Sequence, residues 1–149
     1  MGETRKQLCT FRVENLLCGI EVERVQEVVR YREMTSVPLS PPEVLGLINL
    51  RGQIVTAIDL RRRMGLEDRT DGKPPMNIVA LGNDGLISLQ VDEIIDVLDI
   101  DEGACEGPPE PLDPFVKSLV KKVYKLETEL LLVLDADKVF DVTEGVDVV

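Results

Sequence analysis

Apolar and polar residues alternate along much of the chain, a pattern typical of half-buried β-strands. In residues 8–13, Cys9, Phe11 and Val13 fall on one face and polar residues on the other. Similar runs occur at 16–22, 76–81 and 86–91. Short strands of this kind, with few helical patterns between them, predict an all-β protein built from small barrels or a sandwich.

Turn and capping residues divide these runs. Arg51-Gly52 separates two apolar runs and predicts a hairpin turn, and the polar segment 67–75 is the best internal boundary. Proline suits the first turn of a helix, and Ser or Asp suits the position before it. On these signals, short helices are expected near 41–46, 59–64 and 135–141.

The charge and the rare residues exclude several classes of function. The chain has 149 residues, with 28 acidic and 17 basic side chains and a net charge of −11. A phosphate backbone or an anionic membrane would repel such a surface, so we expect neither nucleic acid nor membrane insertion. The absence of histidine excludes Ser-His-Asp hydrolysis, phosphohistidine transfer and histidine-based zinc chemistry. Three cysteines without CxxC spacing, and no apolar leader, favour a reducing, cytoplasmic location.

An acidic stretch near residue 100 is the nearest approach to a metal site. Counted from Asp99, an EF-hand loop would place ligands at Asp101 and Glu110. Gly103 stands where Asp or Asn is needed, and Ala104 replaces the required glycine. We therefore expect no metal or cofactor. Because no nucleophile accompanies any paired carboxylates, we also expect no enzymatic activity.

Three ordered segments carry a resemblance to a known family. Residues 18–28 read CGIEVERVQEV and resemble the "YGIDI..VQEI" segment of the CheW family, the coupling proteins of bacterial and archaeal chemotaxis. Residues 46–55 read GLINLRGQIV and resemble that family's "KGVINLRG.IV" signature, and residues 131–135 resemble its closing "LILVDI". The similarity extends over residues 8–142.

The resemblance implies two five-stranded β-barrel lobes packed over a shared apolar core. We expect one CheW-like domain over residues 1–149, with lobe one at roughly 15–75 and lobe two at roughly 7–13 plus 76–145. The family implies a non-enzymatic adaptor that couples chemoreceptors to a CheA-type histidine kinase in signalling arrays. The implied partners are the kinase regulatory domain and the cytoplasmic tip of a chemoreceptor, and the isolated chain is expected to be a monomer.

The resemblance also assigns roles to individual residues. The residues implied to bind the kinase are Val22, Val25, Glu27 and Gly46. The residues implied to bind the receptor are Arg51, Asn77 and Ile78. A second kinase contact would involve Glu110 and Leu112, in a proline loop that lacks the phenylalanine usual in the family.

Two alternatives stay open at this stage. A divergent adaptor could bind a receptor but no kinase and serve a pathway other than motility. A small-molecule-binding β-barrel is an alternative from another class, and it would need a deep apolar pocket. No motif in the sequence supports the second alternative.

Overall fold

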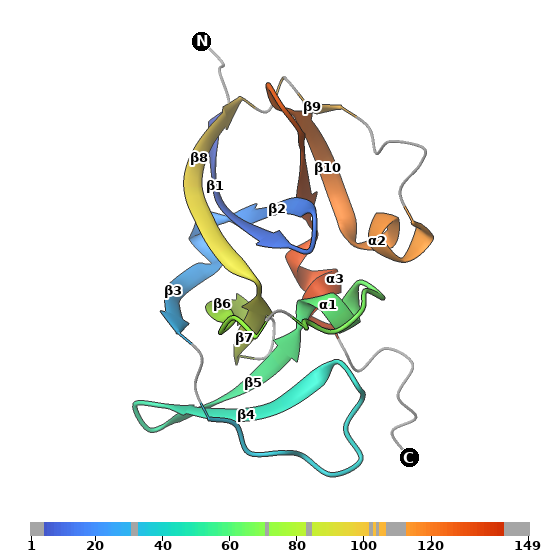
Figure 1. The fold of residues 1–149 in the computed structure, drawn as a ribbon. Helices are drawn as coiled ribbons and strands as arrows, with labels where there is room; N and C mark the ends of the chain where they lie inside the picture. The colour runs from blue at the N-terminus through green and yellow to red at the C-terminus, as the bar shows by residue number, and fades with distance from the viewer. Residues whose placement is uncertain are drawn as a thin grey trace.

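The computed structural model describes residues 5–30, 33–70, 72–82, 85–101, 103, 105–106 and 113–141. Its strands form a six-stranded and a five-stranded sheet, drawn one above the other in Figure 1. The six-stranded sheet has the order β8 (Glu93–Asp101), β1 (Arg5–Val13), β2 (Leu16–Glu21), β11 (Leu130–Leu134), β10 (Val120–Lys125), β9 (Cys105–Glu106). The five-stranded sheet has the order β3 (Val25–Arg30), β6 (Met76–Gly82), β7 (Gly85–Val91), β5 (Gln53–Asp59), β4 (Val44–Leu50). The predicted all-β class is confirmed.

The two sheets share one plan. Each contains two antiparallel hairpins that meet through a parallel pair, β2 with β11 in one sheet and β7 with β5 in the other. Each sheet also has a single strand on the outer side of one hairpin: β8 lies beside β1 of the β1–β2 hairpin, and β3 lies beside β6 of the β6–β7 hairpin. The molecule is therefore a structural repeat of two similar sheets.

The outer strands are exchanged between the two halves of the repeat. Strand β3 follows the β1–β2 hairpin along the chain but pairs in the other sheet, and β8 follows the β6–β7 hairpin and pairs with β1. The chain crosses at η1 (Val22–Arg24), a single 3₁₀ turn, and returns at Asp92. This division differs from the expected lobes in two groups of strands. Strand β2 was expected with residues 25–75 but lies in the six-stranded sheet, and the β6–β7 hairpin was expected with β1 but lies in the five-stranded sheet. The sheets thus keep β1 with β2 and place that hairpin with β3, β4 and β5.

Apolar side chains fill the space between the sheets and the inside of each sheet. The largest buried cluster draws residues from both sheets, and we call it the shared core. It includes Phe11, Ile20, Ile58, Ile78, Leu89, Leu132 and Val139. A second cluster lies on the six-stranded sheet alone and a third on the five-stranded sheet alone. The predicted core shared by two sheets is confirmed.

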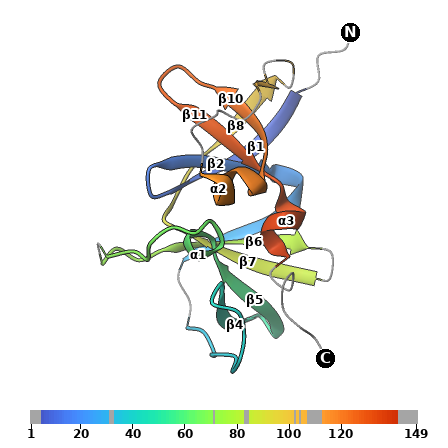
Figure 2. The same ribbon diagram turned by 90° about the vertical axis from the view of Figure 1, so that its right-hand side faces the viewer.

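Three short helices gather at the level where the sheets meet, on one side of the molecule (Figures 1 and 2). Two of them confirm the predictions near 59–64 and 135–141: α1 (Leu60–Arg63) and α3 (Ala136–Phe140). Asp59 caps α1 by accepting hydrogen bonds from the Arg61 and Arg62 amides, at 2.9 and 3.4 Å. Asp135 caps α3 through the Lys138 amide at 3.3 Å.

The helix predicted near 41–46 is wrong. Residues 41–43 make only a turn, closed by the bond from the Val44 amide to the Pro41 carbonyl at 3.0 Å, and Val44 begins strand β4. The Ser40 hydroxyl donates to the Val37 carbonyl at 2.8 Å and so caps no helix. A helix that the sequence analysis missed, α2 (Pro114–Leu119), begins after Asp113, which accepts from the Phe115 amide at 2.8 Å.

The two sheets are open sheets and not the closed barrels that were expected. Within the described residues, the hydrogen-bonded ladders leave β8 and β9 as the edges of one sheet and β3 and β4 as the edges of the other. No helix in the described part of the chain has the length and apolar character needed to cross a bilayer.

Candidate partner-binding site

A β-bulge in β3 decides how the predicted kinase-binding residues face. The register places Val25 opposite Ala80 but Glu27 opposite Val79, so β3 has one residue more than its partner here. Ala80 belongs to the shared core, whereas Val79 belongs to the cluster of the five-stranded sheet. Val25 and Glu27 would share a face in a regular strand; the bulge turns them to opposite faces of the sheet.

Val22 is the first residue of the crossing turn η1, and Val25 directly follows its last residue. Both side chains are half-buried and pack against the margin of the shared core, so each has one side in the interior and one in solvent. Such positions suit an apolar contact with another protein at small cost to the fold. The structure therefore brings these two predicted residues together.

Gly46 is buried in β4 and does not offer a surface to a partner. A Cβ atom at this position would lie 2.5 Å from the Thr35 carbonyl oxygen. Thr35 and Leu47 exchange two backbone hydrogen bonds, at 2.9 and 2.8 Å, and this bridge brings the Thr35 backbone against Gly46. The close approach that the glycine permits is thus to its own chain.

Arg51 lies at the tip of the β4–β5 hairpin. Arg51 and Gly52 have φ values of 50° and 86°, both positive as in a type I′ hairpin turn, and the Asn49 side chain accepts from the Gly52 amide at 2.9 Å. The Arg51 guanidinium forms an ion pair with the Glu27 carboxylate. A residue expected to bind the receptor and one expected to bind the kinase are therefore in direct contact.

Asn77 and Ile78 are both fully buried in β6. Ile78 packs in the shared core, and the Asn77 amide donates to the Arg30 carbonyl at 3.5 Å. Neither side chain can touch a receptor in this structure. The physical reason is that β6 lies between β3 and β7, with apolar clusters on both of its faces.

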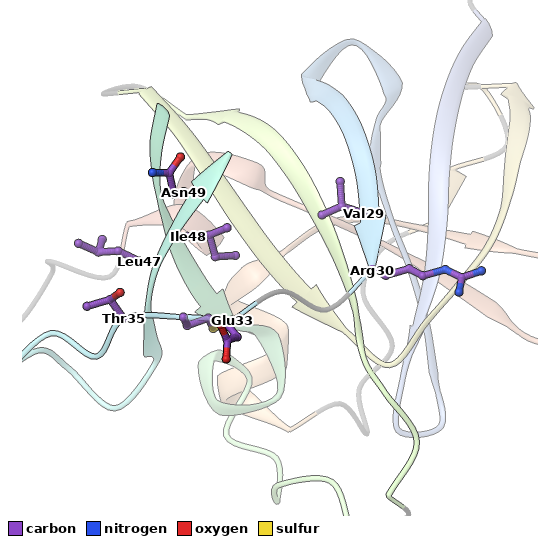
Figure 3. A pocket seen from close by; sticks show the side chains of 8 residues that line it. Val29, Arg30, Glu33, Thr35, Leu47, Ile48 and Asn49 are labelled. Atoms are coloured by element: carbon purple, nitrogen blue, oxygen red, sulfur yellow. The ribbon is translucent and has the colours of Figure 1, made fainter. Parts of the chain in front are cut away.

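A cleft of about 1070 Å³ separates the facing edges β3 and β4 of the five-stranded sheet (Figure 3). Its lining is Val29, Arg30, Glu33, Met34, Thr35, Leu47, Ile48 and Asn49. Val29 and Ile48 come from the two opposite edges, whereas the Arg30 side chain points away from the cleft in Figure 3. The Arg51–Glu27 ion pair connects the same two edges, because Arg51 directly follows β4 and Glu27 lies in β3.

Two predicted positions remain, and the structure adds exposed apolar residues that were not predicted. Glu110 and Leu112 lie outside the described residues. Three apolar side chains that were not among the predicted site residues are exposed to solvent: Val28 by 38%, Ile95 by 43% and Val97 by 51%. They belong to the edge strands β3 and β8, on the side of the molecule opposite the helices (Figures 1 and 2). Their exposure follows from the position of β3 and β8 at sheet edges, and that position is known only from the topology of the sheets.

The buried cysteines Cys9 and Cys18 are not suited to covalent chemistry. Burial raises the pKa of the Cys18 thiol to about 12 and also raises that of Cys9, so both remain protonated and inert at neutral pH. Within the part of the chain that the structure describes, no three acidic or cysteine side chains converge to hold a metal ion.

Comparison with known proteins agrees with this geometry. The family model described as a CheW-like domain matches residues 7–144, which include strands of both sheets. The chain is 30% identical to the chemotaxis protein CheW of Bacillus subtilis over 93% of its own length and 89% of that protein. It is 28% identical to CheW of Treponema pallidum, over 97% and 87% of the two chains.

A solved structure extends the agreement to the fold. The crystal structure of the scaffolding protein TtCheW from Thermoanaerobacter tengcongensis aligns with a TM-score of 0.82 and 29% identity, over 93% of this chain and 94% of that one. The shared sheets, the family match across both of them and the related proteins lead to one conclusion: this chain belongs to the CheW family, a family of non-enzymatic chemotaxis scaffolds.

Proposed function

We propose that this protein couples a chemoreceptor to a CheA-type histidine kinase, as an adaptor with two binding surfaces on one body. The observation that carries the proposal is the family match over residues 7–144, because it includes both sheets and the crossings between them. An adaptor needs a stiff body, and the shared core between the sheets supplies one. We further propose that it works in the cytoplasm, at receptor arrays.

The proposed kinase-binding surface lies around η1 and β3. Val22 and Val25 supply half-buried apolar contacts, and Glu27 supplies a charge at the neighbouring edge. Val28, more exposed than either valine, extends this apolar strip. The kinase regulatory domain is itself CheW-like by the family resemblance, so two similar surfaces would meet in a pseudo-symmetric contact.

The proposed receptor-binding surface includes Arg51. Its side chain is 68% exposed even while it is paired with Glu27, so part of the guanidinium remains accessible. A guanidinium at a turn tip can donate paired hydrogen bonds to a carboxylate or carbonyl on a helical receptor tip. Asn77 and Ile78 are left out of this surface because both are buried.

The test measures the affinity of the purified protein for each partner, the kinase regulatory domain and the receptor cytoplasmic tip from the same source. Val25→Ala should weaken kinase binding, whereas Val120→Ala, which removes the same atoms from a half-buried position at the margin of the shared core in β10, should not. Arg51→Ala should weaken receptor binding about tenfold or less. Arg5→Ala removes an exposed charge from the other sheet and serves as its control.

Each result has a defined meaning. Kinase binding that is lost equally in both valine variants would show a fold effect, and it would remove Val25 from the surface. Receptor binding without kinase binding by the unaltered protein would favour the divergent adaptor. Binding to neither partner would overturn the proposal.

A further inference from the structure

The crossing turn η1 is held weakly by its own residues. It has three residues, none of them fully buried, and Glu21 before it makes no side-chain capping bond. Its closing backbone bond runs from the Val25 amide to the Val22 carbonyl. A 3₁₀ turn of this length has little stability by itself, so other contacts must fix where Val22 and Val25 lie.

Arg24, the last residue of η1, makes those contacts. Its Nε and Nη2 atoms donate to the Leu81 carbonyl oxygen at 3.0 and 2.8 Å, which ties the turn to β6. Nη2 also donates to the Asp137 carboxylate at 2.8 Å, which ties it to α3. The guanidinium carbon lies 5.9 Å from the centre of the Phe140 ring, within the range of a cation–π contact.

The geometry of these contacts distinguishes Arg24 from a binding residue. One planar guanidinium reaches a strand of the five-stranded sheet and a helix that follows the six-stranded sheet. Its donors are directed at acceptors of its own chain, and its side chain is only 30% exposed. Arg24 stands between Val22 and Val25 in the sequence, so its anchor restrains the backbone that carries both valines.

We propose that Arg24 is a positioning residue for the kinase-binding surface, because its fork-shaped bonds to the Leu81 carbonyl and Asp137 fix the turn that carries Val22 and Val25. This inference rests on the proposed kinase-binding function. Arg24 does not touch the kinase in this account; it acts through the two valines. Lysine can replace it only in part, since an ammonium lacks the planar fork that bridges two acceptors.

The first experiment compares Arg24→Ala, Arg24→Lys and Arg30→Ala in affinity for the kinase regulatory domain and in hydrogen exchange of the Val25 amide. Arg30→Ala removes the same charge from an exposed position at the far end of β3, the strand that follows η1, so it is the matched control. We expect Arg24→Ala to weaken binding roughly tenfold and to speed exchange of the Val25 amide. Arg24→Lys should lie between Arg24→Ala and the unaltered protein in both measurements. The control should change neither quantity.

A double-mutant cycle with Asp137→Asn separates positioning from direct contact. If Arg24 acts through its bond to α3, the two substitutions share one effect, and the double variant binds scarcely worse than Arg24→Ala. If Arg24 touched the kinase, its effect would persist at full size in the Asp137→Asn background. Additive losses of affinity would therefore overturn the role of the Asp137 bond, and the Val25 exchange measured in Arg24→Ala then decides whether the Leu81 bonds alone position the turn.

Amide exchange separates failure of this inference from failure of the proposed function. Unchanged Val25 exchange in Arg24→Ala would overturn the positioning role, whatever the kinase does. Absence of kinase binding by the unaltered protein would overturn the proposed function, and with it the purpose assigned to Arg24. A folding defect in Arg24→Ala is recognised by its circular dichroism spectrum, and Arg24→Lys then carries the test.

Discussion

Two buried hydroxyl groups have opposite hydrogen-bonding environments. The Thr10 hydroxyl donates to the Asp96 carbonyl at 2.7 Å and accepts from the Asp96 amide at 3.1 Å, whereas the Ser88 hydroxyl, equally buried, has no partner among the described residues. A buried polar group without a partner is destabilising. We expect Ser88→Ala to stabilise the protein by ~1 kcal/mol, which is a rise of about 2–4 °C in melting temperature.

Thr10→Val is the opposite case, because it removes a hydroxyl with two partners. It should lower the free energy of unfolding by ~1–2 kcal/mol. Thermal and urea unfolding of both variants measure these changes. A loss of stability in Ser88→Ala would mean that its hydroxyl is satisfied, for example by an internal water, and the expectation would be incorrect.

Gly46 is required by space as well as by its backbone conformation. Alanine there would place Cβ against the Thr35 carbonyl oxygen, at 2.5 Å, and separate the backbone bridge between Thr35 and Leu47. Gly72 also has a positive φ, 73°, but nothing lies within 4 Å of its Cβ position. We expect Gly72→Ala to cost ~1 kcal/mol and Gly46→Ala about 2 kcal/mol more, measured by urea unfolding. Equal losses would show that the Thr35 backbone can move away.

At single positions, sequence could suggest a role but not a surface. The resemblance grouped Arg51 with Asn77 and Ile78, and only Arg51 is exposed. The continuous apolar run 78–81 in β6 is consistent with a strand covered on both faces, but the resemblance to the family outweighed it when Asn77 and Ile78 were assigned to a surface. The bulge that turns Val25 and Glu27 apart is invisible in the sequence, since it depends on the register with β6.

At the scale of elements, Glu21 connects three strands of the six-stranded sheet. Its carboxylate, at the end of β2, pairs with Lys121 of β10 and Lys6 of β1, both at 2.9 Å. The hydrogen bonds from Lys121 and Lys6 lower the pKa of Glu21 from 4.5 to about 2. Because the folded-state pKa is below the unfolded value, this stabilisation is present above about pH 4.5 and is lost as the pH falls toward 2.

Glu21→Gln tests that dependence. The variant should be less stable than the unaltered protein at pH 6, and the difference should shrink steadily as urea unfolding is repeated down to about pH 2.5. Glu127→Gln, which removes a charge from an exposed turn, should show no such convergence. A difference that stays constant with pH would mean that Glu21 acts through packing and not through its charge.

Helices were predictable where one side chain determines their start. Asp59 and Asp135 cap the helices expected after them, and these caps are local signals. The same logic failed at Ser40, whose hydroxyl bonds back to Val37, and overlooked Asp113 followed by proline inside a loop-like segment. A capping residue permits a helix, but pairing of the next residues in a sheet can override it, as β4 does after Pro41.

At the scale of the whole molecule, the exchange of β3 and β8 was beyond the reach of sequence patterns. Each strand lies directly after a hairpin, and local pairing with that hairpin is the usual expectation. Here each instead completes the sheet of the other half. Neither sheet can therefore be removed without taking an edge strand from its neighbour, and the two should form one cooperative unit.

Asp92, at the return crossing, provides the test of that cooperativity. It accepts from Arg61 Nη2 at 2.6 Å and from the Glu14 amide at 2.8 Å, and its amide donates to the Arg12 carbonyl at 3.1 Å. Burial alone would raise its pKa, but the hydrogen bonds from Arg61 and Glu14 hold that pKa below its ordinary value. Asp92 is thus charged and paired where the chain passes between the sheets.

We expect Asp92→Asn to lower the free energy of unfolding by ~2 kcal/mol, because Arg61 keeps a half-buried charge without its main partner. Native-state hydrogen exchange should report the same loss at Leu132 in the six-stranded sheet and at Val79 in the five-stranded sheet. The two residues are in different sheets and neither contacts residue 92 through the sheet ladders, so an equal loss requires that both sheets open together. A loss confined to one residue would mean that the sheets unfold separately, and that an adaptor of this fold can loosen one surface while the other stays intact.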